Sequence, residues 1–350
     1  MNHFEKVRSP LTGIALGDAL GLPYEGLSAQ KVARRLAGKP LKPALLPGLM
    51  MVSDDTDHAC MALGAWRDCG GDAEKFSKIL GHRFRWWFAA LPPGVGMATA
   101  KSAIRLWLGW NPAKSGVHSA GNGPLMRAGI LGVVIEDAAT RRIIVDRSTR
   151  LTHTDERSVD AARILAEACT ILGKAGPPVD VADFCAKLSY LSTTPEIQRI
   201  LAALATPPDA GCSIAEYLHV HVLGRGFSKP HRGVTGYAPE SLAAALTAFL
   251  YGGKDGLAVI RTAIDFGGDT DSVASFAGCL MGAADPEAFS DFESKRLLRA
   301  LVDLPWNGAT LDALASGRSP SAVLLALRPL RNLAQLIVVI VHGLLRLVAY

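Results

Sequence analysis

Two short stretches, far apart in the sequence, concentrate side chains that could bind a metal ion. They are Ser-Asp-Asp-Thr-Asp at residues 53–57 and Gly-Gly-Asp-Thr-Asp-Ser at residues 267–272. Each precedes a run of small and apolar residues typical of a helix, at 58–66 and at 273–283. If the starts of these two helices face each other, their carboxylate and hydroxyl oxygens form one site for a hard divalent cation, which prefers oxygen ligands.

The same residues have a simpler explanation as helix caps. Asp, Ser and Thr side chains accept hydrogen bonds from the unpaired N–H groups at a helix start, and acids there interact favourably with the helix dipole. A cap needs only one acceptor, however, whereas each stretch supplies several. Crowded like charges also repel unless a cation neutralises them. The repetition of the pattern therefore favours a metal site over capping alone.

The composition favours a mainly helical protein. Ala and Leu dominate the 350 residues, 49% are hydrophobic, and runs of Val, Ile and Thr are few. The net charge of +5 is modest and the basic residues are scattered, so no nucleic-acid partner is expected. The six cysteines include no Cys-x-x-Cys pair, and most of them are predicted to be reduced core residues of a cytoplasmic protein. Asp18 interrupts the only candidate for a signal peptide.

A helix with glycines four residues apart is predicted at residues 11–22. Small residues at that spacing let another backbone approach closely. Pro23 ends the helix, because proline disfavours helical geometry in the residue before it. Glu25 follows in the turn, where its carboxylate could reach into a site or face solvent as an ordinary loop acid.

A glycine-rich segment at residues 115–129 is the main candidate for binding phosphate. Its Gly121-Asn122-Gly123 turn leads into a helix predicted to start at Pro124, and free N–H groups together with the helix dipole attract phosphate. Arg127 lies one turn into that helix, and His153 lies just before another. Taken alone, Gly-Asn-Gly is also a common turn, and an isolated histidine has many structural uses.

Further helices are predicted at residues 73–90, 98–107, 136–150, 180–204, 213–223, 239–251, 256–264 and 287–303. Trp86 and Trp87 are predicted to be core residues. The apolar tail at residues 333–350 is shorter than the roughly 20 apolar residues of a spanning helix. It also contains Gln335, His342 and Arg346. We therefore expect the tail to pack on the body or on a partner, and membrane association is not expected.

The motifs together resemble those of the ADP-ribosylglycohydrolase family, which includes the dinitrogenase reductase-activating glycohydrolases. The matching motifs are Gly17-Asp18-Ala19-Leu20-Gly21 with Glu25, Ser53-Asp54-Asp55-Thr56, Gly94-Val95-Gly96, Gly121-Asn122-Gly123 with Met126-Arg127, Thr152-His153 and Gly267-Gly268-Asp269-Thr270-Asp271-Ser272. They follow the family's order over residues 10–307, which predicts a family domain at 1–315 and an apolar helical tail at 316–350. Ser53 stands where the family more often has Thr, a change that keeps the ligating oxygen, and Ser272 is an equally mild change.

The resemblance implies a compact all-α fold of many helices around a central cleft that holds a dinuclear Mg²⁺ (or Mn²⁺) centre. By position, it implies the metal ligands Ser53, Asp54, Asp55, Asp269, Asp271 and Ser272. It places Glu25 beside the metals as a gating or acid/base carboxylate, and either Asp55 or Glu25 could take the proton of the attacking water. It also implies that bound ADP-ribose contacts Gly96, Ser119, Gly121, Asn122, Gly123, Arg127 and His153.

The expected function is Mg²⁺-dependent removal of ADP-ribose from a modified protein, with arginine as the acceptor preferred in the family at large. Such an enzyme could reverse a regulatory modification. It could also be the immunity protein against an ADP-ribosyltransferase toxin, which the basic loop at residues 225–232 or the apolar tail could contact. One alternative is a hydrolase of another ADP-ribosyl linkage or of a small ADP-ribosyl compound. Another is a family member that binds ADP-ribose without turnover, against which the intact acidic motifs argue.

Overall fold

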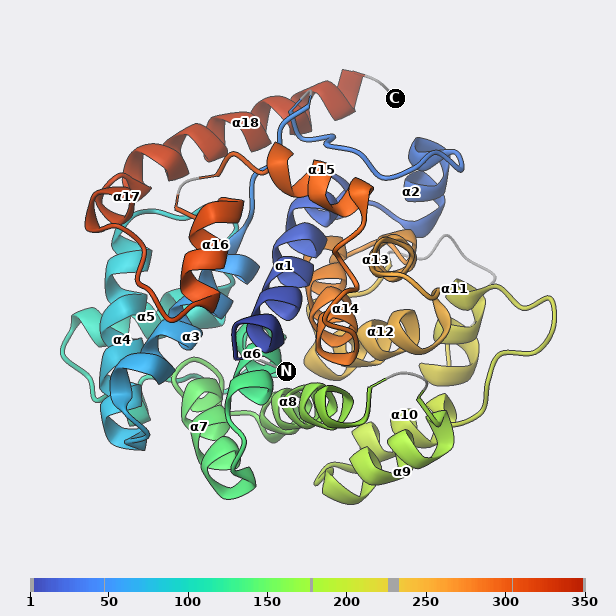
Figure 1. Cartoon of the computed structure of the whole chain (residues 1–350), viewed down its shortest axis with the longest axis horizontal. Coiled ribbons are helices and arrows are strands. Elements are labelled where there is room, and N and C mark those ends of the chain that lie inside the picture. Colours follow the sequence, from blue (N-terminus) through green and yellow to red (C-terminus); the bar gives the residue numbers. More distant parts are fainter. Residues whose placement is uncertain (1–2, 47, 177–178, 226–232, 304, 349–350) are drawn as a thin grey trace.

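A computed structural model of this chain consists of α-helices joined by loops and short helical turns, and it describes every residue except 1–2, 47, 177–178, 226–232, 304 and 349–350. The first half contains α1 (His3–Gly21), α2 (Ala29–Leu36), α3 (Asp54–Cys69), α4 (Ala73–Ala89), α5 (Met97–Trp107), α6 (Leu125–Val134), α7 (Ala138–Arg150) and α8 (Glu156–Ala175). The second half contains α9 (Val181–Leu191), α10 (Pro195–Leu204), α11 (Ile214–Glu216), α12 (Ala238–Tyr251), α13 (Gly256–Asp265), α14 (Thr270–Ala284), α15 (Phe292–Ala300), α16 (Gly308–Ala315), α17 (Ala322–Ala326) and α18 (Arg328–Val348). The described residues contain isolated β-bridges but no β-strand, so the predicted all-α fold is confirmed (Figure 1).

Two helices of small residues, α1 and α14, pack backbone to backbone near the centre of the molecule (Figure 1). A Cβ atom at Gly17 would lie 2.2 Å from Ala274 O, so a side chain is excluded there. This confirms the prediction that the glycine spacing in α1 admits a second backbone. A Cβ atom at Gly21 would lie 2.5 Å from Asp271 Cα. The second acidic stretch therefore starts directly beside the end of α1.

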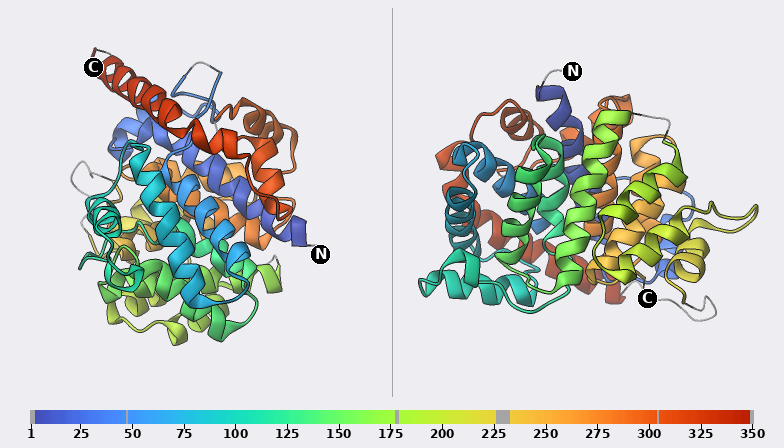
Figure 2. Two further views of the ribbon diagram at one scale, coloured as in Figure 1. Left: turned by 90° about the vertical axis from the view of Figure 1, so that its left-hand side faces the viewer. Right: turned by 90° about the horizontal axis from the view of Figure 1, so that it is seen from below.

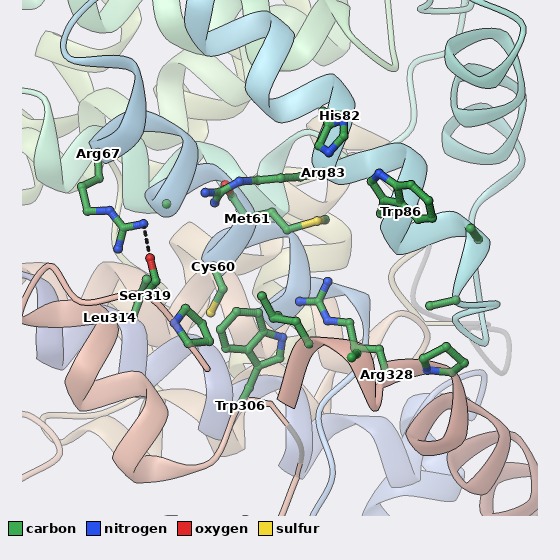
Figure 3. Close-up of a pocket in the computed structure, with 17 residues that line it drawn as sticks. Cys60, Met61, Arg67, His82, Arg83, Trp86, Trp306, Leu314, Ser319 and Arg328 are labelled. Atoms are coloured by element: carbon green, nitrogen blue, oxygen red, sulfur yellow. Dashed lines mark hydrogen bonds between the residues drawn. The ribbon is translucent and has the colours of Figure 1, made fainter. Parts of the chain in front are cut away.

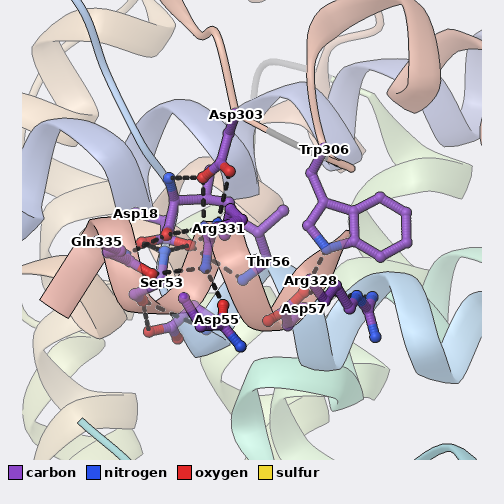
Figure 4. A network of polar contacts seen from close by, with 12 residues as sticks. Asp18, Ser53, Asp55, Thr56, Asp57, Asp303, Trp306, Arg328, Arg331 and Gln335 are labelled. Atoms are coloured by element: carbon purple, nitrogen blue, oxygen red, sulfur yellow. Dashed lines mark hydrogen bonds and ion pairs between the residues drawn. The ribbon is translucent and has the colours of Figure 1, made fainter. Parts of the chain in front are cut away.

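Helix α3 begins within the first acidic stretch, at Asp54, which is earlier than the sequence predicts. Ser53 is its N-cap residue, and the Ser53 hydroxyl accepts a hydrogen bond from Asp55 N. The buried Asp18 carboxylate of α1 accepts hydrogen bonds from Ser53 N at 2.8 Å and from Thr56 N at 3.0 Å. An acid on α1 therefore satisfies N–H groups at the start of α3 and fixes that start against α1 (Figure 4).

Two helices, α9 and α10, occupy the region where the sequence predicts one helix over residues 180–204. The buried Asp160 carboxylate of α8 accepts hydrogen bonds from the Ser192 hydroxyl at 2.7 Å, from Thr193 N at 3.0 Å and from Thr194 N at 2.9 Å. These bonds draw the chain out of helical geometry, and Pro195 then occupies the first turn of α10, where proline is tolerated. The prediction of a continuous helix is therefore wrong. The sequence also does not predict α16, whereas α17 lies within the helical tail predicted at residues 316–350.

The C-terminal helix α18 runs along the outside of the molecule and is attached to it by polar side chains (Figures 2 and 4). Buried Arg331 donates hydrogen bonds to Asp303 Oδ1 and to Val52 O, both at 2.6 Å. Gln335 Nε2 donates to the same carbonyl at 2.7 Å. The tail therefore packs on the body, which is one of the two predicted outcomes. None of the described helices is long and apolar enough to cross a membrane.

Two predictions about single side chains have different outcomes. All six cysteines are free thiols and five of them are buried, as predicted for reduced core residues. Trp87 is also buried, but 59% of the Trp86 side chain is exposed, so the prediction that both tryptophans belong to the core is wrong for Trp86.

Candidate metal centre and adjoining cleft

The starts of α3 and α14 face each other and bring the two acidic stretches together. The Ser272 hydroxyl of α14 donates a hydrogen bond to Asp55 Oδ2 of α3 at 3.1 Å. Asp18, Asp55 and Asp271 are buried, and each offers one carboxylate oxygen to a group in which these oxygens lie within 4.8 Å of one another. One cluster therefore contains acids from both predicted stretches and from α1.

Asp18 is absent from the ligand set that the resemblance implies. Its sequence signals are a carboxylate within a helix that is otherwise small and apolar, and its place in the matching motif Gly17-Asp18-Ala19-Leu20-Gly21. In the structure, Asp18 has two roles in the cluster. It accepts hydrogen bonds from N–H groups at the start of α3, and its carboxylate lies beside those of Asp55 and Asp271.

The cluster is strongly unfavourable for negative charge in the absence of a cation. Burial raises the pKa of Asp18 to about 6. Burial and then the charge of Asp18 raise the pKa of Asp54 and Asp55 well above their usual range, and burial followed by the charges of Glu25 and neighbouring aspartates does the same for Asp271. Burial also raises the pKa of Asp269. No Lys or Arg among the described residues forms an ion pair with these five aspartates.

Two oxygen atoms in the cluster are suited to bind a cation. Asp55 Oδ1 and Asp271 Oδ1 are fully buried and have no hydrogen-bond partner among the described residues. An unpaired buried carboxylate oxygen is costly, and a hard divalent cation is the partner that such oxygens satisfy. The donor set of carboxylates and hydroxyls therefore fits Mg²⁺ or Mn²⁺.

Helix capping accounts for only part of the acidic stretches. Ser53 and Asp18 do cap α3, as described above. Asp269 occupies the N-cap position of α14, but its side chain makes no capping hydrogen bond there. Asp269 Oδ2 instead accepts a hydrogen bond from Asn122 Nδ2 at 2.6 Å. Capping alone therefore does not explain the carboxylates that the sequence places at the two helix starts.

A cleft of about 520 Å³ opens beside the cluster. Its lining includes these predicted site residues: Glu25, Asp54, Gly96, Ser119, Gly121, Asn122, Gly123, His153, Asp269, Asp271 and Ser272. Ser53 and Asp55 are next to this lining. Asp55 Oδ2 accepts hydrogen bonds from the hydroxyls of Ser53 and Ser272. The cleft has the size of a small-molecule site, and both the acids and the glycine-rich turn line it.

The glycine-rich turn packs against the side chain of His153. A Cβ atom at Gly121 would lie 3.0 Å from His153 Nε2, and one at Gly123 would lie 3.1 Å from His153 Cε1. The absence of side chains thus lets the imidazole pack closely against the turn. Burial, and then the charge of Arg127, lower the pKa of His153 to about 3, so the ring is neutral at physiological pH. Asn122 links the turn to the metal cluster through its bond to Asp269.

Arg127 does not line the cleft. Its guanidinium is fully buried and donates hydrogen bonds to Gly123 O at 3.0 Å, to Ser148 Oγ at 2.9 Å and to Thr152 Oγ1 at 2.6 Å. The sequence-based expectation that Arg127 contacts the ligand is therefore corrected to a positioning role. Its long side chain reaches back under the turn and holds the Gly123 carbonyl instead of extending into the cleft.

Glu25 stands at the mouth of the cleft, exposed, in a turn that is attached to the second acidic stretch. Gly26 N donates to Gly268 O at 2.8 Å, and Gly268 N donates to Leu27 O at 2.7 Å. The charge of Glu25 contributes to the raised pKa of Asp271. The turn therefore holds Glu25 within electrostatic reach of the cluster, which favours the site role over an unrelated loop acid.

A second cavity, of about 430 Å³, lies between α3, α4 and the segment from α16 to α18 (Figure 3). Cys60, Trp86, Trp306 and the side chains of three arginines line it. Its described lining contains no carboxylate, so it lacks the ligands of a hard cation. The acidic cleft is therefore the candidate active site.

Comparisons with known proteins show the family of the chain. The sequence model described as ADP-ribosylglycohydrolase matches residues 1–323 of the chain. The chain is 28% identical over 293 residues to an uncharacterised protein of Archaeoglobus fulgidus, and the alignment covers 80% of this chain and 87% of that protein. It is also similar to a solved structure described as an ADP-ribosylglycohydrolase-related protein complex, with 26% identity, a TM-score of 0.64 and coverage of 89% of this chain and 96% of that chain. The family match includes both acidic stretches and the glycine-rich turn.

Proposed function

This chain belongs to the ADP-ribosylglycohydrolase family and is a hydrolase of ADP-ribosyl linkages; we propose that it depends on Mg²⁺ and releases ADP-ribose from arginine side chains of a modified protein. The observation that supports the metal most directly is the pair of buried oxygens without partners, Asp55 Oδ1 and Asp271 Oδ1, beside a cleft of about 520 Å³.

The ligands of the proposed dinuclear centre are Ser53, Asp54, Asp55, Asp269, Asp271 and Ser272, with Asp18 behind them. Bound there, two Mg²⁺ (or Mn²⁺) ions would hold the ribose hydroxyls and make a water molecule a better nucleophile. Asn122 orients Asp269 through its 2.6 Å hydrogen bond. The Ser272 hydroxyl orients Asp55 in the same way. These two hydrogen bonds hold the carboxylates in place before a metal ion or substrate binds.

Hydrolysis breaks the bond between the anomeric carbon of the ribose and the arginine nitrogen, and water supplies the oxygen of the new bond. Positive charge develops on the ribose ring as the first bond breaks, and the carboxylates around the cleft stabilise it. Asp55 or Glu25 accepts one proton of the attacking water and passes it to the departing guanidine nitrogen, so that the carboxylate is restored. Glu25 is the more accessible of the two, because it is exposed at the mouth of the cleft while Asp55 is buried.

The glycine-rich turn provides a second part of the wall of the proposed ADP-ribose site. Ser119, Gly121 and Gly123 line the cleft ahead of α6 and leave room for a diphosphate near backbone N–H groups. Neutral His153 adds no charge to this wall and packs closely against the turn. Gly96, at the start of α5, borders the same space.

The proposed substrate is an ADP-ribosylated protein, and the enzyme would reverse a regulatory modification or protect against an ADP-ribosyltransferase toxin. For toxin contact, the basic loop expected at residues 225–232 lies mostly outside the described residues. Within the described part, Arg225 forms an ion pair with buried Glu240 at 2.7 Å. The apolar tail is the remaining candidate for such contact.

The test is release of ADP-ribose from an arginine-ADP-ribosylated protein after treatment with EDTA, with and without added Mg²⁺. We expect release only after Mg²⁺ is restored. Asp271→Asn should lower the rate by roughly a hundredfold or more, because it removes a proposed ligand. Asp209→Asn, in an exposed loop, is the matched control and should leave the rate unchanged.

Parallel assays with a serine-linked substrate and a small ADP-ribosyl compound separate the alternatives. If ADP-ribose is released faster from either of these than from the arginine-linked protein, that substrate replaces ADP-ribosylarginine in the proposal. Tight binding of ADP-ribose without release from any substrate would contradict the enzyme and favour a binding protein.

A further inference from the structure

The outer face of α18 is apolar throughout the part that the structure describes. Between residues 330 and 344, every residue that is exposed is apolar: Leu330, Leu333, Ala334, Leu336, Ile337, Ile340, Val341 and Leu344. About half of the surface of Ile337, Ile340 and Leu344 is open to solvent. Such a continuous apolar surface is unusual on a protein that has no partner for it.

The polar face of the same helix is turned inward and held there. Arg331 is bonded to Asp303 and Val52 O, and Gln335 is bonded to Val52 O (Figure 4). Asn332 Nδ2 donates to Ala90 O at 2.7 Å. Rotating α18 to bury its aliphatic side chains would break all of these bonds. The outward direction of the apolar face is therefore a consequence of specific contacts.

The shape of this face fits a flat apolar surface better than a single partner helix. The exposed residues span about 160° of the helix circumference, given about 3.6 residues per turn. A seam that packs against one other helix is narrower, since it uses only two positions in seven. The helix is about 30 Å long at about 1.5 Å per residue, and it lies on the surface of the protein along its whole described length.

A basic segment accompanies the apolar face. Residues 26–53 and 313–350 contain no Asp or Glu. The exposed basic residues of the first segment, in α2 and the loop after it, are Lys31, Arg34, Arg35, Lys39 and Lys42. The C-terminal half of α18 contacts the turn that leads to α2, with His342 Nε2 3.3 Å from Pro23 O, and Figure 1 shows α2 near that end of α18.

We propose that α18 and α2 form a docking face for an anionic lipid surface. The apolar side of α18 would lie in the plane of the lipid–water interface, and the basic residues of α2 would contact the lipid head groups. Helices that combine an apolar side with nearby Lys and Arg bind membranes in this way without crossing them. This changes the sequence-based expectation, which judged the tail by its length for spanning and could not show which side faces outward.

The test is sedimentation of the full chain with vesicles of pure phosphatidylcholine and with vesicles of phosphatidylcholine and phosphatidylserine in equal parts. We expect binding to the mixed vesicles that weakens as salt is raised, because the contribution of the charges is screened. Ile337→Gln with Ile340→Gln should weaken it by about tenfold or more, and so should Arg34→Gln with Arg35→Gln.

Ile337→Leu with Ile340→Leu is the matched control and should bind like the unchanged chain. The melting temperature by circular dichroism checks that each variant is folded. It should stay close to that of the unchanged chain, because all the altered side chains are exposed. The proposal is overturned if the mixed vesicles do not bind the unchanged chain. It is also overturned if the chain is a dimer by light scattering that only the Gln variants of α18 dissociate, since the face would then join two copies.

Discussion

At the scale of single residues, Asp18 connects folding to the candidate chemistry. Its carboxylate accepts N–H groups at the start of α3, and it lies within the cluster that includes Asp55 and Asp271. Each additional buried carboxylate raises the free energy of the metal-free fold, because charges of the same sign are brought together away from water. The site is therefore arranged at the expense of stability, as is common where a cation completes the structure.

This arrangement predicts an unusual dependence of stability on pH. The pKa of Asp18 rises from 3.8 to about 6 on folding, and the other acids of the cluster shift in the same direction. The folded state therefore binds more protons than the unfolded state between these values, and stability falls as pH rises through this window. In EDTA, Asp18 alone should make the free energy of unfolding at pH 7 about 2 kcal/mol lower than near pH 4, and the other acids of the cluster add to this difference.

Added Mg²⁺ should remove or reverse this dependence, because ligands bind metal in their deprotonated form. Asp271→Asn should reduce the pH dependence in EDTA and abolish the stabilisation by Mg²⁺. Chemical denaturation across this range, with and without the metal, measures both effects. An equal response to Mg²⁺ in Asp271→Asn and in the unchanged chain would mean that the ion binds elsewhere.

At the scale of helices, the contact between α1 and α14 determines where the acids meet. The two backbones approach so closely that Gly17 faces the Ala274 carbonyl and Gly21 faces Asp271 Cα. The end of α1 then lies against the start of α14, and Asp18 on α1 holds the start of α3. Small residues thus set the relative position of three helices that each contribute a carboxylate to the cluster.

Gly17→Ala should therefore destabilise the protein and disturb the site together. The added Cβ would lie 2.2 Å from Ala274 O, a backbone atom that can move only if the helix moves. We expect a loss of about 3 kcal/mol or more in unfolding free energy and a weaker response to Mg²⁺. Gly343→Ala is the control, because nothing lies within 4 Å of a Cβ atom there, and should stabilise α18 by about 0.5–1 kcal/mol. Equal small effects of both changes in urea denaturation would contradict the role given to the α1–α14 contact.

At the scale of the whole molecule, the tail is joined to the segment that leads into the site. Arg331 of α18 reaches Asp303 and the carbonyl of Val52, and Val52 N donates to Asp303 Oδ2 at 2.7 Å. Val52 directly precedes the first acidic stretch. The predicted division into a domain at 1–315 and a tail at 316–350 stays a prediction, but the contacts show how the tail could support the start of α3.

Removal of one partner of this buried pair is predicted to cost more than removal of both. Arg331→Met would leave the Asp303 carboxylate buried without its cation, at a cost of about 3–5 kcal/mol. Arg331→Met with Asp303→Asn should cost less, because the uncompensated charge is gone. Urea denaturation of the two variants measures the difference. A loss below about 1 kcal/mol for Arg331→Met alone would indicate a tail that does not support the body.

The sequence by itself determined the helical composition, the glycine spacing of α1 and the two acidic stretches, because these depend on local residue types and spacing. It also carried the family resemblance. It could not show that Arg127 lies beneath the glycine-rich turn, since a long side chain one turn into a helix can point to the ligand or away from it. The break between α9 and α10 depends on Asp160 of α8, which lies far from it in sequence.

Only the tertiary structure decided which acids share one cluster and which side of α18 faces outward. Asp18 joins Asp55 and Asp271 because α1, α3 and α14 cross at one place, and no local pattern encodes that crossing. The amphipathic pattern of α18 is visible in the sequence, but a hydrophobic side normally packs inward. Here Arg331, Asn332 and Gln335 hold the polar side against the body through hydrogen bonds to Asp303, Ala90 O and Val52 O. The apolar side faces outward because of these partners, which lie outside α18 in the sequence.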